Sequence, residues 1–169
     1  LHMDCDIVMM SGGLTPTVHL HSQARGKLVW DDKHLCFKPG ASHEAEQSIG
    51  ACTGSFELQR GLTEAIRAAT KAVHSIGGTC TVLSTPDVTA VKISYAPMAY
   101  WKAPSLAGAG QGAKAFVDFQ NDVTSADIQL AVREGYQSVE HVKRYTTTGM
   151  ATDQGKTSNM NALGILADA

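Results

Sequence analysis

Long hydrophobic runs are missing from this sequence, and its longest apolar run, IVMM at residues 7–10, covers only four residues. A helix that crosses a bilayer needs about 18 or more mainly apolar residues. No cationic stretch followed by an apolar core opens the chain, so the pattern of a secretory signal is absent as well. We therefore expect a soluble, cytoplasmic protein.

The chain also has no marked excess of either positive or negative charge. The chain has 14 Lys and Arg residues against 16 Asp and Glu residues, for a formal net charge of −2, and the cationic residues are thinly spread. A protein that neutralises the phosphates of a nucleic acid needs a basic patch or stripe. A nucleic-acid partner is therefore not expected.

Paired cysteines are a further absence, because none of the cysteines stands in a CxxC motif. Such isolated cysteines are typical of reduced thiols in a cytoplasm and not of a disulfide or zinc framework. The four residues concerned are Cys5, Cys36, Cys52 and Cys80.

No catalytic constellation stands at a recognisable spacing either, whether of the Ser-His-Asp or the Cys-His kind. His19 and His21 would point to one side of a strand and could ligate a metal, but no third ligand lies near them in the sequence. Ordinary surface or core histidines are the better interpretation. The chain offers no self-contained catalytic apparatus.

What is present in the first part of the chain indicates short strands and one helix. Residues 5–10 form an apolar run that predicts a buried strand ending at Gly12 and Gly13. A chain that starts in such a strand leaves an edge unpaired, so we expect natural neighbours before it. Residues 28–30 and 35–37 predict a hairpin.

A helix is predicted to follow the turn at residues 50–55, with Thr53 or Ser55 as its cap. Apolar residues recur there at spacings of three and four, which places one apolar stripe on the helix until Gly77 and Gly78 end it. The stripe consists of Leu58, Leu62, Ile66, Ala69, Val73 and Ile76.

Residues 79–112 are rich in Thr, Pro, Ala and Gly, and we interpret them as a linker. Three prolines, Pro86, Pro97 and Pro104, exclude a long helix. Tyr95, Tyr100 and Trp101 carry enough aromatic area that we expect them to lie along a neighbouring surface.

Residues 113–169 predict a small, mostly helical module. After a strand at residues 114–119, Thr124 and Asp127 have the spacing of a capping box, and Gly135 ends that helix. A second helix is expected from Ser138 to about Tyr145. A third is expected to turn three apolar side chains inward, those of Met160, Leu163 and Leu166.

The expected fold class is therefore α+β. Residues 1–78 form an α/β segment, residues 79–112 a linker, and residues 113–169 the helical module.

The polar stretch between the last two predicted helices carries the clearest chemistry, since Lys143, Arg144 and Lys156 stand there among glycines and hydroxyls. A helix N-terminus attracts anions through its free amides and its dipole. Gly155, Lys156 and Thr157 suggest a Walker A motif, but five residues separate Gly149 from Gly155 where that motif needs four. A capped helix preceded by an ordinary surface turn remains the alternative.

Residues 138–159, SVEHVKRYTTTGMATDQGKTSN, are very similar to the alpha subunit of heterotetrameric sarcosine oxidase. Three earlier segments resemble the same subunit in the same order: SGGLTPTVHLHSQ at 11–23, GKLVW at 26–30 and GACTGSFEL at 50–58. The resemblance covers nearly the whole chain and identifies it as an internal piece of that subunit.

The resemblance implies a flavoprotein-like dinucleotide-binding domain at residues 1–78, which would support NAD binding. In this family the complex converts sarcosine to glycine with hydrogen peroxide and forms methylenetetrahydrofolate from tetrahydrofolate. The beta subunit holds FAD and covalent FMN, and gamma and delta subunits complete the complex. The chain alone would be inactive, because the amine site lies in another subunit.

Family positions carry over to a few residues of this sequence. The turn at Gly50 is expected to approach NAD, with Ala51, Phe56 and Leu58 as contacts. Separately, the convergence of Lys143, Arg144 and Lys156 around a helix N-terminus leads us to expect them at an anion or subunit interface near the FMN phosphate.

The module after the linker also resembles the ferredoxin-like domain of opine oxidases and bacterioferritin-associated ferredoxin, in which four cysteines bind a two-iron two-sulfur cluster. Here those positions hold Asp118, Gln120, Asp153 and Ser158. Cluster sites need thiolates, so we expect no iron–sulfur cluster. We expect the four residues to lie together and to close by a hydrogen bond from Gln120 or Ser158 to Asp153.

Two functions of different class remain open. One is a part of an oxidase complex that supports dinucleotide binding and subunit docking. The other is a stand-alone, non-catalytic module that binds a phosphate-containing ligand or a protein partner.

Overall fold

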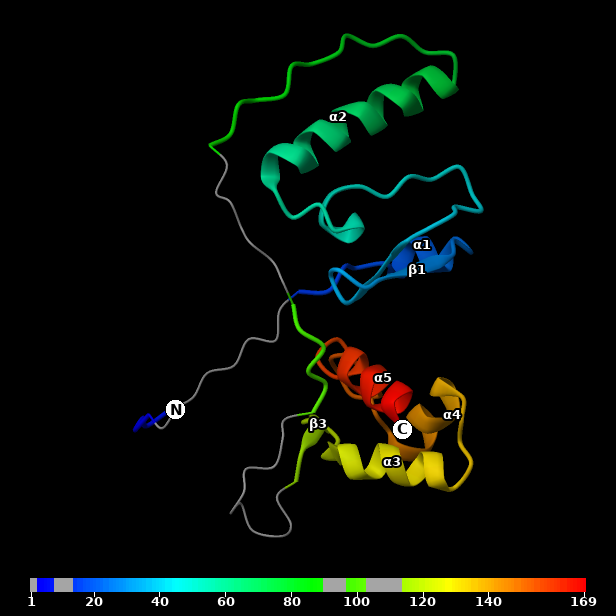
Figure 1. Cartoon of the computed structure of the whole chain (residues 1–169). Coiled ribbons are helices and arrows are strands. Elements are labelled where there is room, and N and C mark those ends of the chain that lie inside the picture. Colours follow the sequence, from blue (N-terminus) through cyan, green and yellow to red (C-terminus); the bar gives the residue numbers. More distant parts are fainter. Residues whose placement is uncertain (1–2, 8–13, 90–96, 103–113) are drawn as a thin grey trace. The chain divides into compact units, whose positions relative to one another are not determined.

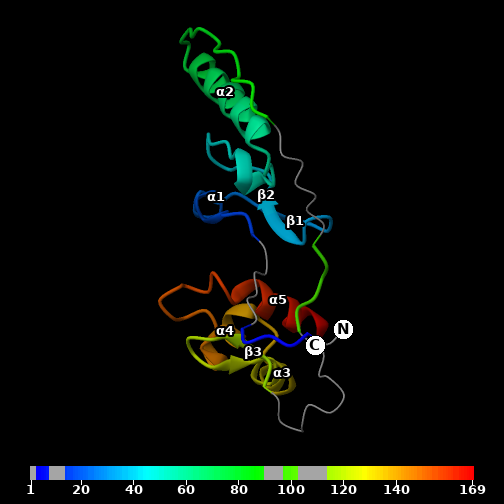
Figure 2. The same ribbon diagram turned by 90° about the vertical axis from the view of Figure 1, so that its left-hand side faces the viewer.

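The computed structural model of the chain describes residues 3–7, 14–89, 97–102 and 114–169. The chain divides into two compact units, Leu1–Met98 and Ala99–Ala169. The described residues contain both helices and two-stranded sheets, as the expected α+β class requires. The finer division at residues 78 and 112 stays a prediction. Figure 1 shows the elements of both units, and Figure 2 shows them from a second direction.

The first unit contains the predicted hairpin, made of β1 (Leu28–Asp31) and β2 (Cys36–Pro39) in antiparallel pairing. Trp30 stands opposite Phe37, and their rings meet edge to face with centroids 5.0 Å apart. Such an aromatic pair stabilises two paired strands beyond the area that it buries. The hairpin prediction is confirmed.

Asp31 organises the turn of this hairpin. Its carboxylate accepts hydrogen bonds from the amides of Lys33 (2.9 Å) and His34 (3.2 Å), and it forms an ion pair with Lys38. The Lys38 ammonium, followed by the His34 ring, holds the pKa of Asp31 well below its usual range. The turn is thus closed by one carboxylate.

The predicted long helix is α2 (Leu58–Ser75). It begins after Glu57, whose side chain makes no capping bond, so the expected caps Thr53 and Ser55 are wrong. Thr53 instead donates to the Gly50 carbonyl within the preceding 3-10 turn η1 (Gly50–Thr53), and Ser55 donates to the side chain of Glu64 in α2. Both hydroxyls are therefore engaged by other acceptors and do not cap the helix.

Burial in the first unit is sparse. No residue of α2 is buried, and Leu58 and Ile76 of the expected apolar stripe are 64% and 84% exposed. An amphipathic helix gains most of its stability from packing its apolar face. Leu62, Ile66 and Val73 of the same stripe are half-buried, so the described residues cover the stripe only in part.

The opening strand is only partly testable. Residues 5–7 form no strand, and Ile7 is 78% exposed, so the prediction of a buried strand is wrong for them. Residues 8–13 lie outside the described residues. His19 and His21 belong to the short helix α1 (His19–Gln23) and not to a strand.

The second unit begins with a small antiparallel sheet of β3 (Phe116–Asp118) and β4 (Val123–Thr124). Helix α3 (Ser125–Arg133) follows at once. The Thr124 hydroxyl accepts from the Asp127 amide at 3.3 Å, and the Asp127 carboxylate accepts from the Thr124 amide at 2.8 Å. The predicted capping box is confirmed, and it stabilises the first turn of α3.

Helices α4 (Val139–Thr146) and α5 (Asn159–Asp168) complete the second unit and pack on α3 (Figure 1). Ile128 and Ala131 of α3 are fully buried. Both belong to the hydrophobic core of this unit, which consists of Val117, Val123, Ile128, Ala131, Val142 and Ile165.

The inward face of α5 differs from the predicted one. Gly164 and Ile165 are its buried residues, whereas Met160 and Leu163 are only half-buried. Leu166 is also half-buried but packs against the core, as predicted. Trp101 packs against this helix, and a Cβ atom at position 164 would lie 2.3 Å from its indole ring. Glycine at this position thus lets an aromatic residue of the expected linker cover α5, as we expected for Trp101. Tyr100 is 60% exposed, and Tyr95 lies outside the described residues.

In the described part of the chain, no helix has both the length and the apolar character needed to cross a membrane.

Replacing Ile128 with Ala should destabilise the second unit by about 2–5 kcal/mol, because the side chain is fully buried and its loss leaves a cavity. Urea denaturation followed by Trp101 fluorescence, in a Trp30→Phe background, measures this change. Ile76→Ala is the control, since Ile76 is exposed. Equal midpoints for the two variants would contradict this description of the core.

Candidate functional site

The loop between α4 and α5 is fastened to β3 by the buried carboxylate of Asp118, which is 2% exposed. One carboxylate oxygen accepts from the amides of Gln120 (2.9 Å) and Asn121 (3.1 Å), within its own turn. The other oxygen accepts from the amide of Gly149 at 2.8 Å, 31 residues away. One side chain thus joins two distant segments of backbone.

Side chains add two more bonds between these segments. The Thr152 hydroxyl donates to the Gln120 side-chain oxygen at 2.8 Å, and the Asn121 side-chain amide donates to the Thr147 carbonyl at 2.9 Å. The turn after β3 and the loop after α4 therefore form one hydrogen-bonded structure.

The end of the loop is organised by Asp153. Its carboxylate accepts from the Thr157 hydroxyl (2.6 Å), the Thr157 amide (3.2 Å) and the Gly155 amide (3.1 Å). These bonds, led by the Thr157 hydroxyl, lower the pKa of Asp153. The polar stretch before α5 is thus held by its own side chains.

The four positions that correspond to cluster cysteines lie on these two joined segments. Asp118 bonds to Gly149 and Gln120 to Thr152, so both contact the loop that carries Asp153 and Ser158. The expected bond to Asp153 is wrong, because Gln120 accepts from Thr152 and the Ser158 hydroxyl has no partner among the described residues. Ser158 is nevertheless fully buried.

Two glycines of the loop are required by close packing. Gly149 and Gly155 have φ angles of 70° and 74°. A Cβ atom at either position would lie 2.3 or 2.2 Å from the side-chain oxygen of Asn159. Both the left-handed backbone and the approach of Asn159 therefore exclude larger residues here.

Two of the predicted cationic residues meet at one cavity. Lys143 and Arg144, near the end of α4, line a cavity of about 190 Å³ together with Glu140, Gly149, Met150 and Gln154. Neither cation forms an ion pair within the described residues. Lys156 is exposed on the loop and does not line this cavity.

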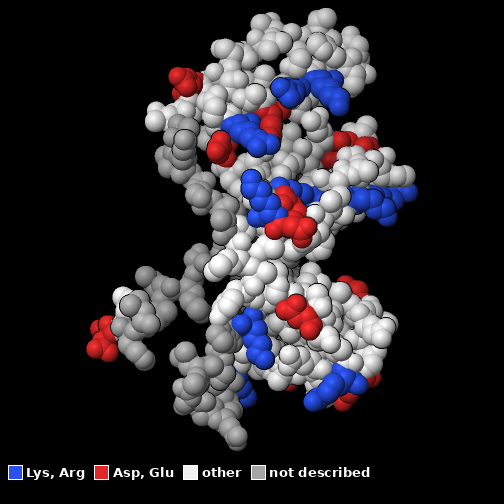
Figure 3. Space-filling view, in the orientation of Figure 1, with Lys and Arg blue, Asp and Glu red and all other residues white. Residues whose placement is uncertain are grey.

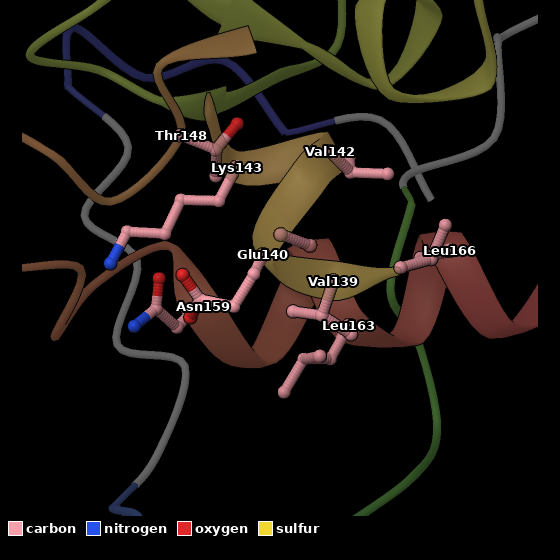
Figure 4. Close-up of a pocket in the computed structure, with 9 residues that line it drawn as sticks. Val139, Glu140, Val142, Lys143, Thr148, Asn159, Leu163 and Leu166 are labelled. Carbon is pink, nitrogen blue, oxygen red and sulfur yellow. The ribbon is translucent and has the colours of Figure 1, made fainter. Parts of the chain in front are cut away.

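A second cavity of about 120 Å³ lies between α4 and α5 (Figure 4). Val139, Leu163 and Leu166 supply apolar side chains, whereas Glu140, Lys143 and Asn159 bring polar groups to its other end. Lys143 and Glu140 border both cavities. The two cavities therefore share a polar boundary on α4.

The predicted NAD contacts lie in the first unit, around η1. Gly50 has a φ of 69°, and no atom lies within 4 Å of the position of a Cβ there. Its amide donates to Glu64 at 2.9 Å, and the Ser55 hydroxyl donates to the other oxygen of Glu64 at 2.6 Å. The hydrogen bond from Ser55, followed by that from the Gly50 amide, lowers the pKa of Glu64.

The remaining predicted contacts are open to different degrees. Ala51 and Leu58 are exposed, while Phe56 is half-buried, with its ring centroid 6.3 Å from that of His34. The turn can thus offer backbone and apolar side chains to a ligand. Its Gly50 amide is already used by Glu64.

Charge does not gather in one place on the face that Figure 3 shows. Lys and Arg side chains alternate there with Asp and Glu over both units. This distribution agrees with the formal net charge of −2. Any anion recognition therefore depends on individual cavities.

Comparison with known proteins gives a consistent result over almost the whole chain. Residues 112–169 match the model of the sarcosine oxidase A3 domain family. The sarcosine oxidase subunit alpha of Rhizobium meliloti (strain 1021) is 40% identical over 164 residues, which is 97% of this chain. The chain belongs to the sarcosine oxidase alpha subunit family.

Two further alpha subunits of sarcosine oxidase, from Corynebacterium sp. strains P-1 and U-96, are 38% and 39% identical over 166 residues, again 97% of this chain. The chain spans only 16% to 17% of the length of these three relatives. It thus corresponds to a small segment of a sarcosine oxidase alpha subunit, which by its name is one component of a larger enzyme.

The hydrogen-bonding roles of two carboxylates in this alpha-subunit segment were not predicted from the sequence, where Asp118 was named only as the position of a cluster cysteine and Glu64 was not named. Asp118 stands at a strand end before a turn, and this pattern often predicts an aspartate that accepts turn amides. Glu64 offered no such signal, because its bonds to Gly50 and Ser55 depend on how α2 leaves the turn.

Replacing Asp118 with Asn should destabilise the second unit by about 1–3 kcal/mol, since one amide oxygen cannot serve three backbone donors. Urea denaturation measures the loss, and faster hydrogen exchange at Gly149 locates it. Asp122→Asn is the matched control, because Asp122 is exposed and its φ of 53° suits asparagine. An Asp118 variant as stable as this control would show that the carboxylate does not hold the loop.

Proposed function

We propose that this chain is a non-catalytic part of a sarcosine oxidase alpha subunit that supports NAD binding and subunit docking. The observation that carries the proposal is the 38–40% identity to sarcosine oxidase alpha subunits along 97% of the chain. The complex would oxidise sarcosine to glycine with release of hydrogen peroxide and formation of methylenetetrahydrofolate. Substrate oxidation would take place in another subunit.

In this proposal the turn at Gly50 lies against NAD, with Ala51, Phe56 and Leu58 as its contacts. The positive φ and the empty space beside Gly50 suit a close approach of backbone to a dinucleotide. Because Glu64 already holds the Gly50 amide, the turn would contribute shape and not an amide for the pyrophosphate. When bound, NAD would act as a hydride carrier.

Lys143 and Arg144 would form an anion-binding subsite at the interface with the beta subunit, near the phosphate of FMN. Two cations without ion pairs at one cavity fit a phosphate group, and the arginine fork is well suited to it. Lys156 would extend this surface from the loop. FAD would be bound by the beta subunit, and gamma and delta subunits would complete the assembly.

The helical module would descend from the bacterioferritin-associated ferredoxin fold without its cluster. The side chains present do not fit an iron–sulfur cluster, because Asp118, Gln120, Asp153 and Ser158 offer only oxygen and amide groups where cluster iron requires thiolates. Both Asp118 and Asp153 are also engaged by backbone amides. Hydrogen bonds would thus have replaced metal as the link between the two segments.

A stand-alone binding module is the alternative function. It is favoured by the cavity at Lys143 and Arg144, which lies wholly within the second unit and needs no residue of the first. In that case inorganic phosphate or a phosphorylated ligand would bind to this chain without other subunits.

Lys143→Ala and Arg144→Ala, introduced into the full alpha subunit, should lower covalent FMN incorporation or weaken subunit association roughly tenfold or more, since each removes a charged hydrogen-bond donor. Flavin content and the mass distribution of the purified complex measure this. Arg133→Ala is the control, an exposed arginine on α3 that lines neither cavity of α4. Lys156→Ala tests the loop separately. Unchanged flavin content and assembly in all variants would show that these residues bind neither FMN nor another subunit.

The purified chain should be colourless and should contain neither iron nor acid-labile sulfide in stoichiometric amounts, because no thiolate stands at the four family positions. Visible absorption together with iron and sulfide assays tests this after expression with added iron. Stoichiometric iron and sulfide would contradict the proposed loss of the cluster.

A further inference from the structure

His21 in α1 is enclosed on several sides and is only 3% exposed. Its ring nitrogen Nδ1 lies 2.6 Å from the Glu46 carboxylate oxygen Oε1, and Nε2 lies 3.0 Å from the carbonyl oxygen of Lys27. Gly26 packs against the ring so closely that a Cβ there would lie 2.3 Å from Nε2. The ring therefore has no room to turn away from either partner.

The two partners fix the number of protons on the ring. A carbonyl oxygen and an ionised carboxylate only accept hydrogen bonds, whereas a neutral imidazole has one N–H to donate. With a neutral ring, one of these short contacts would place two lone pairs against each other. Both contacts are favourable only when each ring nitrogen carries a proton.

A protonated Glu46 could donate to the ring instead, but its surroundings oppose this. The Ser42 hydroxyl, followed by the His21 ring, forms hydrogen bonds that lower the pKa of Glu46. The Ser48 hydroxyl adds a longer contact of 3.5 Å to its second oxygen. The carboxylate form is thus the favoured partner of His21.

We propose that doubly protonated His21 is a latch that fastens the hairpin and the segment at residues 41–46 to α1, and that loss of its proton opens this latch. The Lys27 carbonyl that accepts from His21 also accepts from the Gly40 amide at 2.7 Å, and the Lys27 amide donates to the Ala41 carbonyl at 2.9 Å. The latch therefore holds the base of the hairpin, just before the chain reaches Gly50.

The other charged groups near the latch are exposed. Arg25 pairs with Glu44 at 3.5 Å, and His43 lies 3.9 Å from the same carboxylate. His19 lies on α1 itself and is exposed, and the Lys27 side chain lies at the start of the hairpin. Exposed pairs of this kind contribute little, so the pair of buried His21 and half-buried Glu46 dominates.

The proposal predicts loss of the latch at both ends of the pH range. Because the pKa of Glu46 is lowered in the fold, its contribution is present above its unfolded pKa and is lost as pH falls through the folded pKa. On the alkaline side the latch is lost because a neutral ring cannot donate to both acceptors. Between these limits the segment at 41–46 stays closed on α1.

The test uses NMR on the whole 169-residue chain. With the latch closed, the His21 ring should show two N–H protons. The amides of Lys27 and Gly40 should exchange at least about tenfold more slowly than at alkaline pH, after correction for intrinsic exchange. His21→Gln and Glu46→Gln should raise exchange at both amides by a similar factor, and His21→Gln should remove its dependence on alkaline pH.

His19→Gln and Glu44→Gln are the matched controls, since both residues are exposed neighbours on the same segments. They should leave exchange at Lys27 and Gly40 unchanged. A His21 ring with a single N–H while both amides remain protected would overturn the proposal. So would equal effects of the His21 and His19 variants. Should His21→Gln disorder the first unit, the ring protons and amide exchange of the unchanged chain still decide the question.

Discussion

The arrangement of the second unit depends on the buried carboxylate of Asp118. A carboxylate without partners would be costly at 2% exposure, but three backbone amides donate to it, two from its own turn and one from Gly149. Because Gly149 follows α4, this one group sets where the loop to α5 runs. The cavity at Lys143 and Arg144 is bordered by the same loop, so its shape also follows from Asp118.

The first unit is held together in a different way. Its described residues include few buried side chains and no cluster like the apolar core of the second unit. Carboxylates organise its turns instead: Asp31 closes the hairpin, Glu46 holds His21, and Glu64 joins the Gly50 turn to α2. Such polar contacts specify local geometry but bury little apolar surface, and Leu58 and Ile76 of the apolar stripe stay exposed.

These features suit the proposed role in supporting an enzyme complex. The described residues contain no cluster of three or more groups that could hold a metal ion. What they offer is surface: two adjoining cavities on α4, unpaired cations at one of them, and a turn with open space beside Gly50. Each of these needs another molecule to have an effect.

The sequence by itself determined the elements whose signals are local. The 3.6-residue periodicity predicted α2, the Thr124 and Asp127 spacing predicted the start of α3, and alternating short runs predicted the hairpin. These patterns succeed because their hydrogen bonds and packing link residues that are close along the chain. The resemblance along nearly the whole sequence indicated the family as well.

Only the tertiary structure decided which distant groups meet. The caps expected at Thr53 and Ser55 were taken by the turn and by Glu64, and the buried face of α5 was set by Trp101 packing on Gly164. Gln120, which was expected to bond to Asp153, accepts from Thr152 instead, and Asp118 accepts from the distant Gly149 amide. No local pattern encodes such pairings, because each depends on where two separate segments come to rest against a shared core.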